Sequence, residues 1–257
     1  MNHPTKVKTQ RDGPVLTVTL ADEDKRNALS HQLSTELIEA FDTAEADDGV
    51  RVVVVTNTGR TFCAGADLSE RSGDSPVSPI DPAEIFGRIR RSRKPYVGRI
   101  AGHAVAGGMG LAAAMDISVA VKNATFGFTE VRVGVAPAII SVICLPKMRQ
   151  ADAASAFLRG NRFPAAEAVS LGLINEAAGA DTLDQRIDAI VADLLEGGPE
   201  ALAAAKRLLS AVPSMPFDQA LKWAAGVSAD LFKGAEGQEG MTAYLEKRPP
   251  DWSPRSH

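Results

Sequence analysis

Glu130 is the residue of this sequence best placed for proton transfer. It lies among apolar residues in the segment FGFTEVRVG, residues 126–134, just after a predicted strand at 125–128. Burial disfavours an ionised carboxylate, so an apolar setting would raise the pKa of Glu130 and suit it to proton transfer near neutrality. The residue types support a second interpretation equally well, a structural glutamate that pairs with Arg132 or another arginine.

Two segments rich in small residues could bind a ligand through their backbone. Residues 62–68 read FCAGADL and residues 106–111 read AGGMGL, and each follows a predicted strand. Small side chains let a ligand approach the peptide backbone closely. The second segment also opens a short helix, whose unpaired N–H groups suit a phosphate or a developing oxyanion. For residues 62–68, a tight strand-to-helix turn without a ligand is an equally good interpretation.

Other sequence motifs for cofactor binding or catalysis either lack the secondary structure that they require or do not occur in this sequence. Gly108, Gly110 and Ala113 fit a dinucleotide fingerprint, but only about five residues separate Gly110 from Asp116 and the next strand. That is too short for the helix of a dinucleotide-binding unit. The chain has no P-loop, no G-x-S-x-G elbow and no metal-ligand spacing of histidines or cysteines. We expect His103, close to the glycine segment, to be packed or hydrogen-bonded rather than catalytic.

The elements that must position these segments alternate between strands and helices. Residues 15–20 alternate apolar and β-branched polar side chains, as in a half-buried strand. Apolar residues then recur at helical spacing from Leu33 to Phe41, with Ser30 available as the N-cap. The nearly all-apolar run at 50–56 predicts a strand covered on both faces. This strand–helix–strand order predicts an α/β fold.

Later segments extend the pattern. We expect a loop at 71–82, a helix at 82–91, and strands at 96–100, 119–121 and 125–128. The helix at 82–91 runs into a series of basic residues, which we interpret as a solvated helix end favoured by the helix dipole: Arg88, Arg90, Arg91, Arg93 and Lys94.

The second half of the chain is predominantly helical. Helical patterns cover 137–148, 151–158, 164–170 and 181–195, and two more follow at 199–210 and 216–231. The sequence Gly197-Gly198-Pro199 between them is the best boundary signal. We therefore expect a core at residues 1–196 and a C-terminal helical region at residues 197–257.

Composition places the chain among soluble globular proteins. Its 257 residues are 45% hydrophobic and 23% charged, enough for one large domain with a buried core. The net charge of −4 and the aromatic content of 5% argue against a nucleic-acid partner. No apolar run is long enough for a membrane span, and the first residues do not resemble a signal peptide. Cys63 and Cys144 suit core thiols in a reducing compartment, so we expect a cytoplasmic protein.

Taken together, several motifs resemble those of the crotonase (enoyl-CoA hydratase/isomerase) family, in the family's order and over nearly the whole chain. They lie at residues 25–30 (KRNALS), 62–68, 101–120, 126–137 and 239–248. The resemblance implies an α/β fold, a crotonase-like spiral of β-β-α turns. It also implies a C-terminal helical region that builds homotrimers, often paired into hexamers.

The resemblance further implies an acyl-CoA substrate, with no separate cofactor and no metal. The backbone N–H groups of Ala66 and Gly107 would form the oxyanion hole for the thioester carbonyl, and Glu130 would be the catalytic carboxylate. Ala64 would bind the adenine, and Lys25 and Arg26 the nucleotide phosphates, while Tyr244 and Lys247 would reach the CoA of a neighbouring subunit. The other residues expected at the CoA site are Ala28, Asp67, Leu68 and Gly108.

Gly110 departs from the pattern that this resemblance suggests. Hydratases of the two-glutamate type carry a second glutamate just after the glycine run, where this chain has Gly110. A single glutamate also serves the family's Δ3,Δ2-enoyl-CoA isomerases. Residues 129–141, however, resemble a hydratase branch that acts on branched glutaconyl-CoA esters and has glycine at the same point.

The sequence therefore favours an enoyl-CoA hydratase, with a branched, methylglutaconyl-type thioester among its candidate substrates. An isomerase or another enolate chemistry stays open. So does a non-catalytic acyl-CoA-binding scaffold, which would need no buried carboxylate at position 130.

Overall fold

The computed structural model describes residues 4–70 and 82–254. The predicted loop at 71–82 therefore lies outside the described residues, apart from its last position. No helix in these two ranges is both long and apolar enough to cross a membrane.

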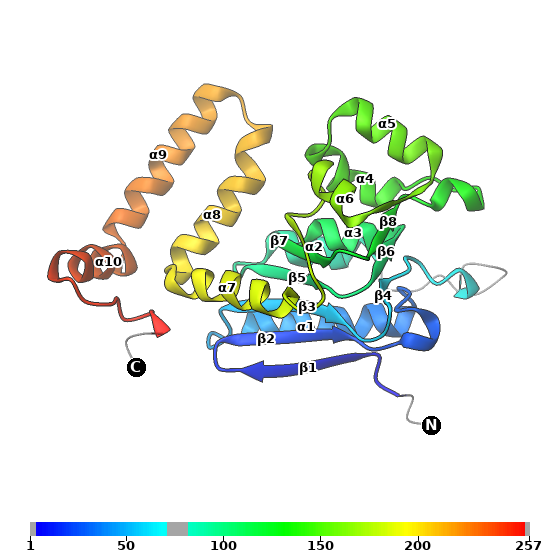
Figure 1. The fold of residues 1–257 in the computed structure, drawn as a ribbon. Helices are drawn as coiled ribbons and strands as arrows, with labels where there is room; N and C mark the ends of the chain where they lie inside the picture. The colour runs from blue at the N-terminus through cyan, green and yellow to red at the C-terminus, as the bar shows by residue number, and fades with distance from the viewer. Residues whose placement is uncertain (1–3, 71–81, 255–257) are drawn as a thin grey trace.

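Two β-sheets form the centre of the molecule (Figure 1). The larger sheet has the order β1-β2-β3-β5-β7-β10, and the smaller has the order β4-β6-β8-β9. The larger sheet contains β1 (Val7–Asp12), β2 (Val15–Leu20), β3 (Val52–Asn57), β5 (Tyr96–Ile100), β7 (Ile117–Val121) and β10 (Glu176–Ala178). The smaller contains β4 (Thr61–Cys63), β6 (His103–Val105), β8 (Thr125–Gly127) and β9 (Arg162–Pro164). Pairing is antiparallel for β1 with β2 and for β8 with β9, and parallel for the other neighbours.

The chain repeats one path through these sheets. It runs from β3 to β4 to helix α2 (Ala83–Arg91), then from β5 to β6 to α3 (Gly107–Ala114), then from β7 to β8 to α4 (Ala138–Cys144). Each turn places one strand in the larger sheet and the next strand in the smaller sheet. This topology confirms the predicted α/β spiral of β-β-α turns.

Helix α1 (His31–Ala46) forms as its apolar spacing predicts. Ser30 Oγ accepts a hydrogen bond from Leu33 N at 3.3 Å, which satisfies one of the free amides of the first turn. Leu33, Leu37 and Phe41 are almost completely buried, and Phe41 packs edge-on against Tyr96 of β5 with 5.0 Å between ring centroids. All six residues of β3 are buried, which confirms a strand covered on both faces.

The helices after residue 137 match the predictions with one correction. Residues 150–196 contain α5 (Gln150–Arg159), α6 (Ala165–Ser170) and α7 (Leu183–Glu196). The predicted helix at 137–148, however, ends as α4 at Cys144 and continues as a 3-10 turn, Leu145–Lys147. Pro146 lies in that turn and has no N–H to donate, so it cannot extend the α-helical hydrogen bonding.

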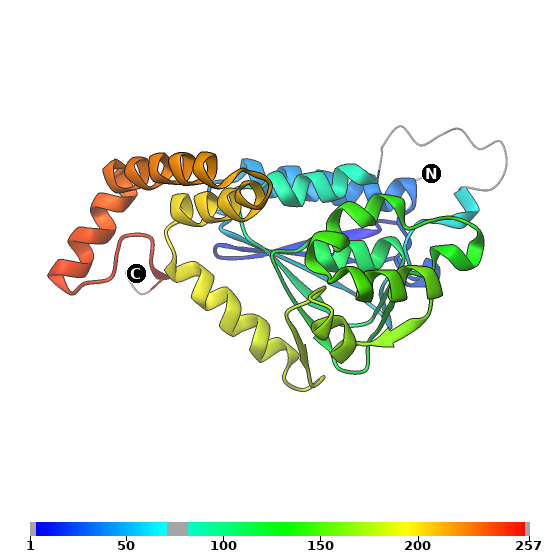
Figure 2. The same cartoon turned by 90° about the horizontal axis from the view of Figure 1, so that it is seen from above.

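The C-terminal region contains three helices where the sequence predicted two. They are α8 (Pro199–Ala211), α9 (Phe217–Lys233) and α10 (Ala235–Glu246). In both views α9 and α10 lie at one end of the molecule, away from the sheets (Figures 1 and 2). Glycine disfavours helix interiors, and the run Gly234, Gly237 and Gly240 hid α10 in the sequence. The division at residue 196 stays a prediction.

Candidate active site

Three loops meet at one edge of the smaller sheet. Strands β4, β6 and β8 are parallel neighbours in that order, so their carboxyl ends lie side by side. The segments that follow them are residues 64–68, 106–108 and 128–130, which contain the predicted backbone donors and the predicted catalytic glutamate. The carboxyl edge of parallel strands is a common place for ligand sites. Sheet topology therefore gathers three segments that are far apart in sequence.

The loop after β4 is fixed by the segment at residues 25–29. Leu29 N donates to Gly65 O at 2.7 Å, and Ala64 N donates to Arg26 O at 3.1 Å. Leu29 and Ala66 also form an isolated parallel β-bridge. Ala28 is buried, whereas Lys25 and Arg26 are exposed beside this loop. The structure therefore brings the N-terminal and β4 parts of the predicted CoA site together.

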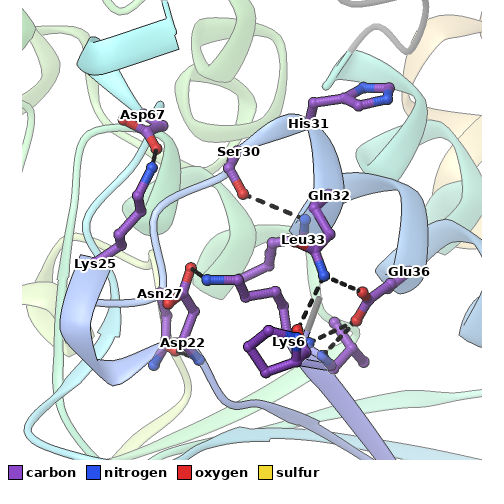
Figure 3. Close-up of polar contacts among 12 residues, drawn as sticks. Lys6, Asp22, Lys25, Asn27, Ser30, His31, Gln32, Leu33, Glu36 and Asp67 are labelled. Atoms are coloured by element: carbon purple, nitrogen blue, oxygen red, sulfur yellow. Dashed lines mark hydrogen bonds and ion pairs between the residues drawn. The ribbon is translucent and has the colours of Figure 1, made fainter. Parts of the chain in front are cut away.

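Asn27 holds this segment in place. Its buried amide donates to Thr61 O at 2.7 Å. Its Oδ1 accepts a hydrogen bond from Asp22 N at 2.7 Å, and Figure 3 shows these two residues side by side. Arg26 and Asn27 both have positive φ values, a backbone conformation that the surrounding hydrogen bonds must maintain. Sequence reasoning missed Asn27, although a polar residue inside the KRNALS motif is a signal for such an anchor.

Asp67 and Lys25 form an ion pair at the mouth of the same loop. Lys25 Nζ lies 2.6 Å from Asp67 Oδ2, and the Asp67 side chain is 8% exposed (Figure 3). Burial raises the pKa of Asp67, but hydrogen bonds from Lys25 and Ser69 outweigh it and leave the pKa below its usual value. The ion pair thus places the Lys25 ammonium beside the loop. Leu68, which follows, is exposed.

The amides of Ala66 and Gly107 lie on adjacent loops. A Cβ atom on Gly65 would come within 2.9 Å of Gly107 N, and a Cβ on Gly107 would lie 3.7 Å from Ala66 N. Gly65 has a φ of +86°, so both its conformation and this close approach require glycine. Within the described ranges, neither the Ala66 amide nor the Gly107 amide donates a hydrogen bond. Two free donors therefore stand close to each other at this edge.

The turn into α3 is conformationally strained. Ala106, the residue before the helix, has a φ of 50° and a ψ of −128°. Strained non-glycine residues of this kind cluster at functional sites. At the nearby Gly108 there is no room for a side chain, because a Cβ atom would lie 2.0 Å from Cys63 O. Sequence reasoning singled out the glycines but not Ala106.

Glu130 begins a 3-10 turn, Glu130–Val133, directly after the β8 loop. Its side chain is half-buried, and Oε2 is buried without a hydrogen-bond partner among the described residues. Burial raises the pKa of Glu130 above its ordinary value. Arg132 donates instead to Gly160 O at 2.6 Å. The interpretation of Glu130 as a structural partner of Arg132 is therefore wrong.

Gly110 faces Ile140 of α4. A Cβ on Gly110 would lie 2.2 Å from Ile140 Cγ2 and 2.8 Å from Ile140 Cβ. Ile140 is 3% exposed and is branched at Cβ, so it cannot swing aside as a long flexible side chain could. The space that a side chain at position 110 would need is already filled by an apolar group. Sequence reasoning gave no sign of this pairing.

Tyr244 and Lys247 are not brought to the same place within one chain. They lie at the end of α10, which both views put at the opposite end of the molecule from β4 (Figures 1 and 2). Both side chains are exposed. The remaining polar candidate, His103, has a structural role as expected, since its Nδ1 accepts a hydrogen bond from Thr125 N at 3.0 Å. Cys63 and Cys144 are free, buried thiols, and burial raises the pKa of each to about 12.

The sequence as a whole matches a known family. The profile of the family described as enoyl-CoA hydratase/isomerase matches residues 10–255. The chain belongs to this family. A Thermus thermophilus relative, whose name assigns it provisionally to the enoyl-CoA hydratases, is 36% identical over 93% of this chain and 97% of its own length. Carnitinyl-CoA dehydratase of Salmonella typhi is 31% identical over 95% of this chain and 97% of its own length.

Solved structures of this family have the same fold. The crystal structure of an enoyl-CoA hydratase from Mycobacterium smegmatis matches with a TM-score of 0.90 and 30% identity, over 97% of this chain and 99% of that one. One from Geobacillus kaustophilus matches with a TM-score of 0.87 and 31% identity, over 95% and 96% of the two chains. These similarities confirm the resemblance read from the motifs and support an enzyme of the hydratase/isomerase class.

Proposed function

We propose that this family member is an enoyl-CoA hydratase, which adds water across the 2,3 double bond of a 2-enoyl-CoA thioester. The observation that carries the proposal is a buried carboxylate oxygen of Glu130 that has no hydrogen-bond partner among the described residues. It belongs to the sheet edge where the amides of Ala66 and Gly107 lie together. Relatives named enoyl-CoA hydratase and carnitinyl-CoA dehydratase support the hydration–dehydration class.

The two amides would act on the thioester carbonyl. When their N–H groups donate to the carbonyl oxygen, they polarise the conjugated double bond and make C3 electrophilic. As water adds at C3, the electrons of the double bond move onto that oxygen as an enolate. Removing one such donor typically costs about 3–4 kcal/mol of transition-state stabilisation. The two amides therefore stabilise the negative charge of the enolate, and this step needs no metal ion or redox cofactor. CoA takes part only as a portion of the substrate.

Glu130 would manage the protons. Its carboxylate accepts a proton from the attacking water, and the same proton, or its equivalent, then goes to C2 as the enolate collapses. Burial raises the pKa of Glu130, so this pKa lies closer to neutral pH than the pKa of an ordinary glutamate does. Because one carboxylate serves both steps, water addition and protonation would take place on one face of the substrate.

The remaining predicted residues would bind the CoA part. Ala64 would contact the adenine, and the exposed cations of Lys25 and Arg26 would contact the phosphates. Lys25 would do so while paired with Asp67, which keeps the ammonium beside the loop. Ala28, Leu68 and Gly108 would also contact the CoA part of the substrate.

We also propose a homotrimer, or a hexamer built from two trimers, because one chain keeps Tyr244 and Lys247 far from the candidate site. Large apolar side chains stand exposed on the C-terminal helices, among them Leu209, Phe217, Tyr244 and Leu245. Exposed patches of this kind mark association surfaces. Light scattering on the intact protein measures the mass directly, and an active monomer would contradict the assembly. The buried free thiols fit the proposed cytoplasmic location.

A second candidate is a Δ3,Δ2-enoyl-CoA isomerase. The filled space between Gly110 and Ile140 favours it, because an apolar group stands where an acid at position 110 would need room. In that reaction Glu130 would move a proton between C2 and C4 through the same enolate. A non-catalytic scaffold is less well supported, since burying an unpartnered carboxylate costs stability that pure binding does not require.

One assay series separates these activities. The purified protein is offered short, long and branched 2-enoyl-CoAs, a methylglutaconyl-type ester among them, and in parallel a 3-enoyl-CoA. Formation of 3-hydroxyacyl-CoA from the 2-enoyl substrates supports the hydratase, and the best chain identifies the acyl specificity. Conversion of the 3-enoyl substrate alone would establish the isomerase instead, and turnover of none of them would overturn both assignments.

A further inference from the structure

The basic run at the C-terminal end of α2 lines a cavity that the proposed reaction does not use. This cavity, the arginine pocket, has a volume of about 560 Å³ and lies between the end of α2 and helices α8 and α9. Figure 2 shows α2 ending next to α8. The guanidinium groups that line the pocket belong to Arg90, Arg91, Arg93 and Arg207. Among the described residues, the loops after β4, β6 and β8 contribute no lining residue, so the pocket is separate from the described part of the candidate active site.

The charge of the arginine pocket is unbalanced. Within residues 4–70 and 82–254, its lining holds four arginines and one carboxylate, Glu200, and these five side chains have a net charge of +3. Glu200 pairs with Arg93, and Arg91 shares Glu84 with Arg88. Arg207 lies over the Trp223 ring, 5.7 Å from its centroid, and has no carboxylate partner in the described part of the chain. Like charges that converge on a cavity repel one another unless an anion joins them.

The helix dipole explains only part of this arrangement. Cations near the C-terminal end of α2 are favoured, which accounts for Arg90 and Arg91. Arg93 lies beyond that helix and Arg207 comes from α8, more than a hundred residues later in the chain. Arg90 also donates to Ser210 O at 2.9 Å, so its guanidinium is held across the junction with α8. A solvated helix end therefore does not account for the whole cluster.

The remaining lining gives the pocket an apolar side. Ala203, Ala204 and Leu231 contribute methyl and isobutyl groups, whereas the hydroxyl of the buried Ser92 already donates to Glu45 Oε2 at 2.5 Å. The cavity volume lies within the range of small-molecule sites, which are often found where two parts of a chain meet. Each guanidinium has five N–H donors, so donors stay available beyond the contacts already made. An occupant that fits carries several negative charges on a compact apolar frame.

We propose that the arginine pocket binds a small organic polyanion with at least two phosphate or carboxylate groups. The ligand bridges Arg90, in the last turn of α2, and Arg93, just after it, to Arg207 of α8. It thereby stabilises the junction between the sheets and the C-terminal helices. This site is independent of the proposed hydratase activity, and it holds whichever acyl-CoA reaction the protein catalyses.

Calorimetric titration of the full-length protein with inorganic pyrophosphate tests the site, and citrate serves as a second probe for carboxylates. Both probes are added at matched ionic strength. Arg207→Gln and Arg90→Gln each remove one guanidinium from the pocket, and each weakens pyrophosphate binding by about tenfold or more, since charge-assisted hydrogen bonds are lost. Arg159→Gln on α5 removes the same charge from an exposed position elsewhere and leaves the affinity unchanged. Circular dichroism confirms that each variant is folded.

The outcomes separate this site from the proposed CoA site. Binding of either probe that falls in the two pocket variants but persists in Arg159→Gln and Lys25→Met supports the arginine pocket. Loss in Lys25→Met alone would place the anion beside Asp67 and overturn the proposal. Equal binding by all variants, or binding of neither probe by the wild-type protein, would overturn it as well. Activity enters none of these outcomes, so they stand apart from the test of the proposed function.

Discussion

Ile140 occupies the space into which a side chain at Gly110 would extend, with Ile140 Cγ2 only 2.2 Å from the position of the missing Cβ. The two residues come from α3 and α4, so this contact joins two successive turns of the spiral. It gives a physical reason for the lack of an acid at position 110: a longer side chain there would require a different residue at position 140.

The Gly110–Ile140 contact predicts a strong energetic coupling. Gly110→Ala should lower the free energy of unfolding by about 1–3 kcal/mol through overpacking, although alanine favours helices more than glycine does. In an Ile140→Ala background the same change should be neutral or stabilising, because the clash is gone. Urea unfolding of the two single variants and the double variant measures the coupling. Strictly additive changes would show that the two residues do not compete for space.

Two substitutions at Gly107 separate the role of its N–H donor from the effect of adding a side chain. Gly107→Pro removes the N–H donor at the first position of α3, where proline is tolerated by a helix. We expect a loss in kcat of about 10²–10³-fold, the usual cost of one oxyanion donor. Gly107→Ala is the matched control, because its Cβ would lie 3.3 Å from Gly65 Cα while the donor is kept. Equal activity of the two variants, both folded, would rule out the donor role.

The raised pKa of Glu130 predicts a dependence of stability on pH. Because burial raises this pKa above the ordinary value of 4.5, the folded protein holds the proton more tightly than the unfolded chain does. The stability that this group contributes is therefore fully present below the ordinary pKa and is lost as pH rises through the raised one. Glu130→Gln removes the titration, so we expect the variant to gain stability relative to wild type as pH rises above the ordinary pKa of 4.5. Denaturant unfolding at several pH values measures this, and a difference that stays constant with pH would contradict it.

Lys206 of α8 should be needed to hold the C-terminal helices on the core. Its ammonium lies 2.7 Å from Asp116 Oδ2 and donates to Lys94 O at 2.6 Å, under the ring of Tyr96. Lys206→Met removes this ion pair and the ammonium donor of Lys94 O, while the partly exposed Asp116 still accepts a hydrogen bond from Tyr96 N, and we expect the free energy of unfolding to fall by about 1–3 kcal/mol. Lys222→Met on α9 removes an exposed lysine and serves as the control. If the two variants are equally stable, the contacts of the buried Lys206 ammonium do not anchor α8.

Local patterns predicted most of the elements because local forces form them. The Ser30 cap, the apolar face of α1 and the all-apolar β3 are visible in a few consecutive residues. Strand β1 was missed because it is an edge strand with a polar, mostly exposed surface, which gives no apolar alternation. Its register is set by pairing with β2, a contact that a single segment does not reveal.

The candidate site shows the same division between local and long-range information. Its glycine segments and Glu130 stand out by residue type, and the motifs carry the family resemblance. Their meeting at one edge depends on the parallel order of β4, β6 and β8, which sequence patterns alone do not specify. The strained Ala106, the anchor Asn27 and the filler Ile140 each depend on contacts with distant segments. These are the residues that sequence reasoning missed.

The rate of 2-enoyl-CoA hydration by Glu130→Gln tests the central claim most directly. Glutamine keeps the shape of the side chain but cannot accept the proton, so we predict a kcat at least about 10²-fold below wild type, in a variant with unchanged circular dichroism and oligomer mass. Glu167→Gln, which changes an exposed glutamate on α6, should keep the wild-type rate. A Glu130→Gln protein that hydrates the substrate at the wild-type rate would contradict the assignment of this carboxylate as the catalytic group.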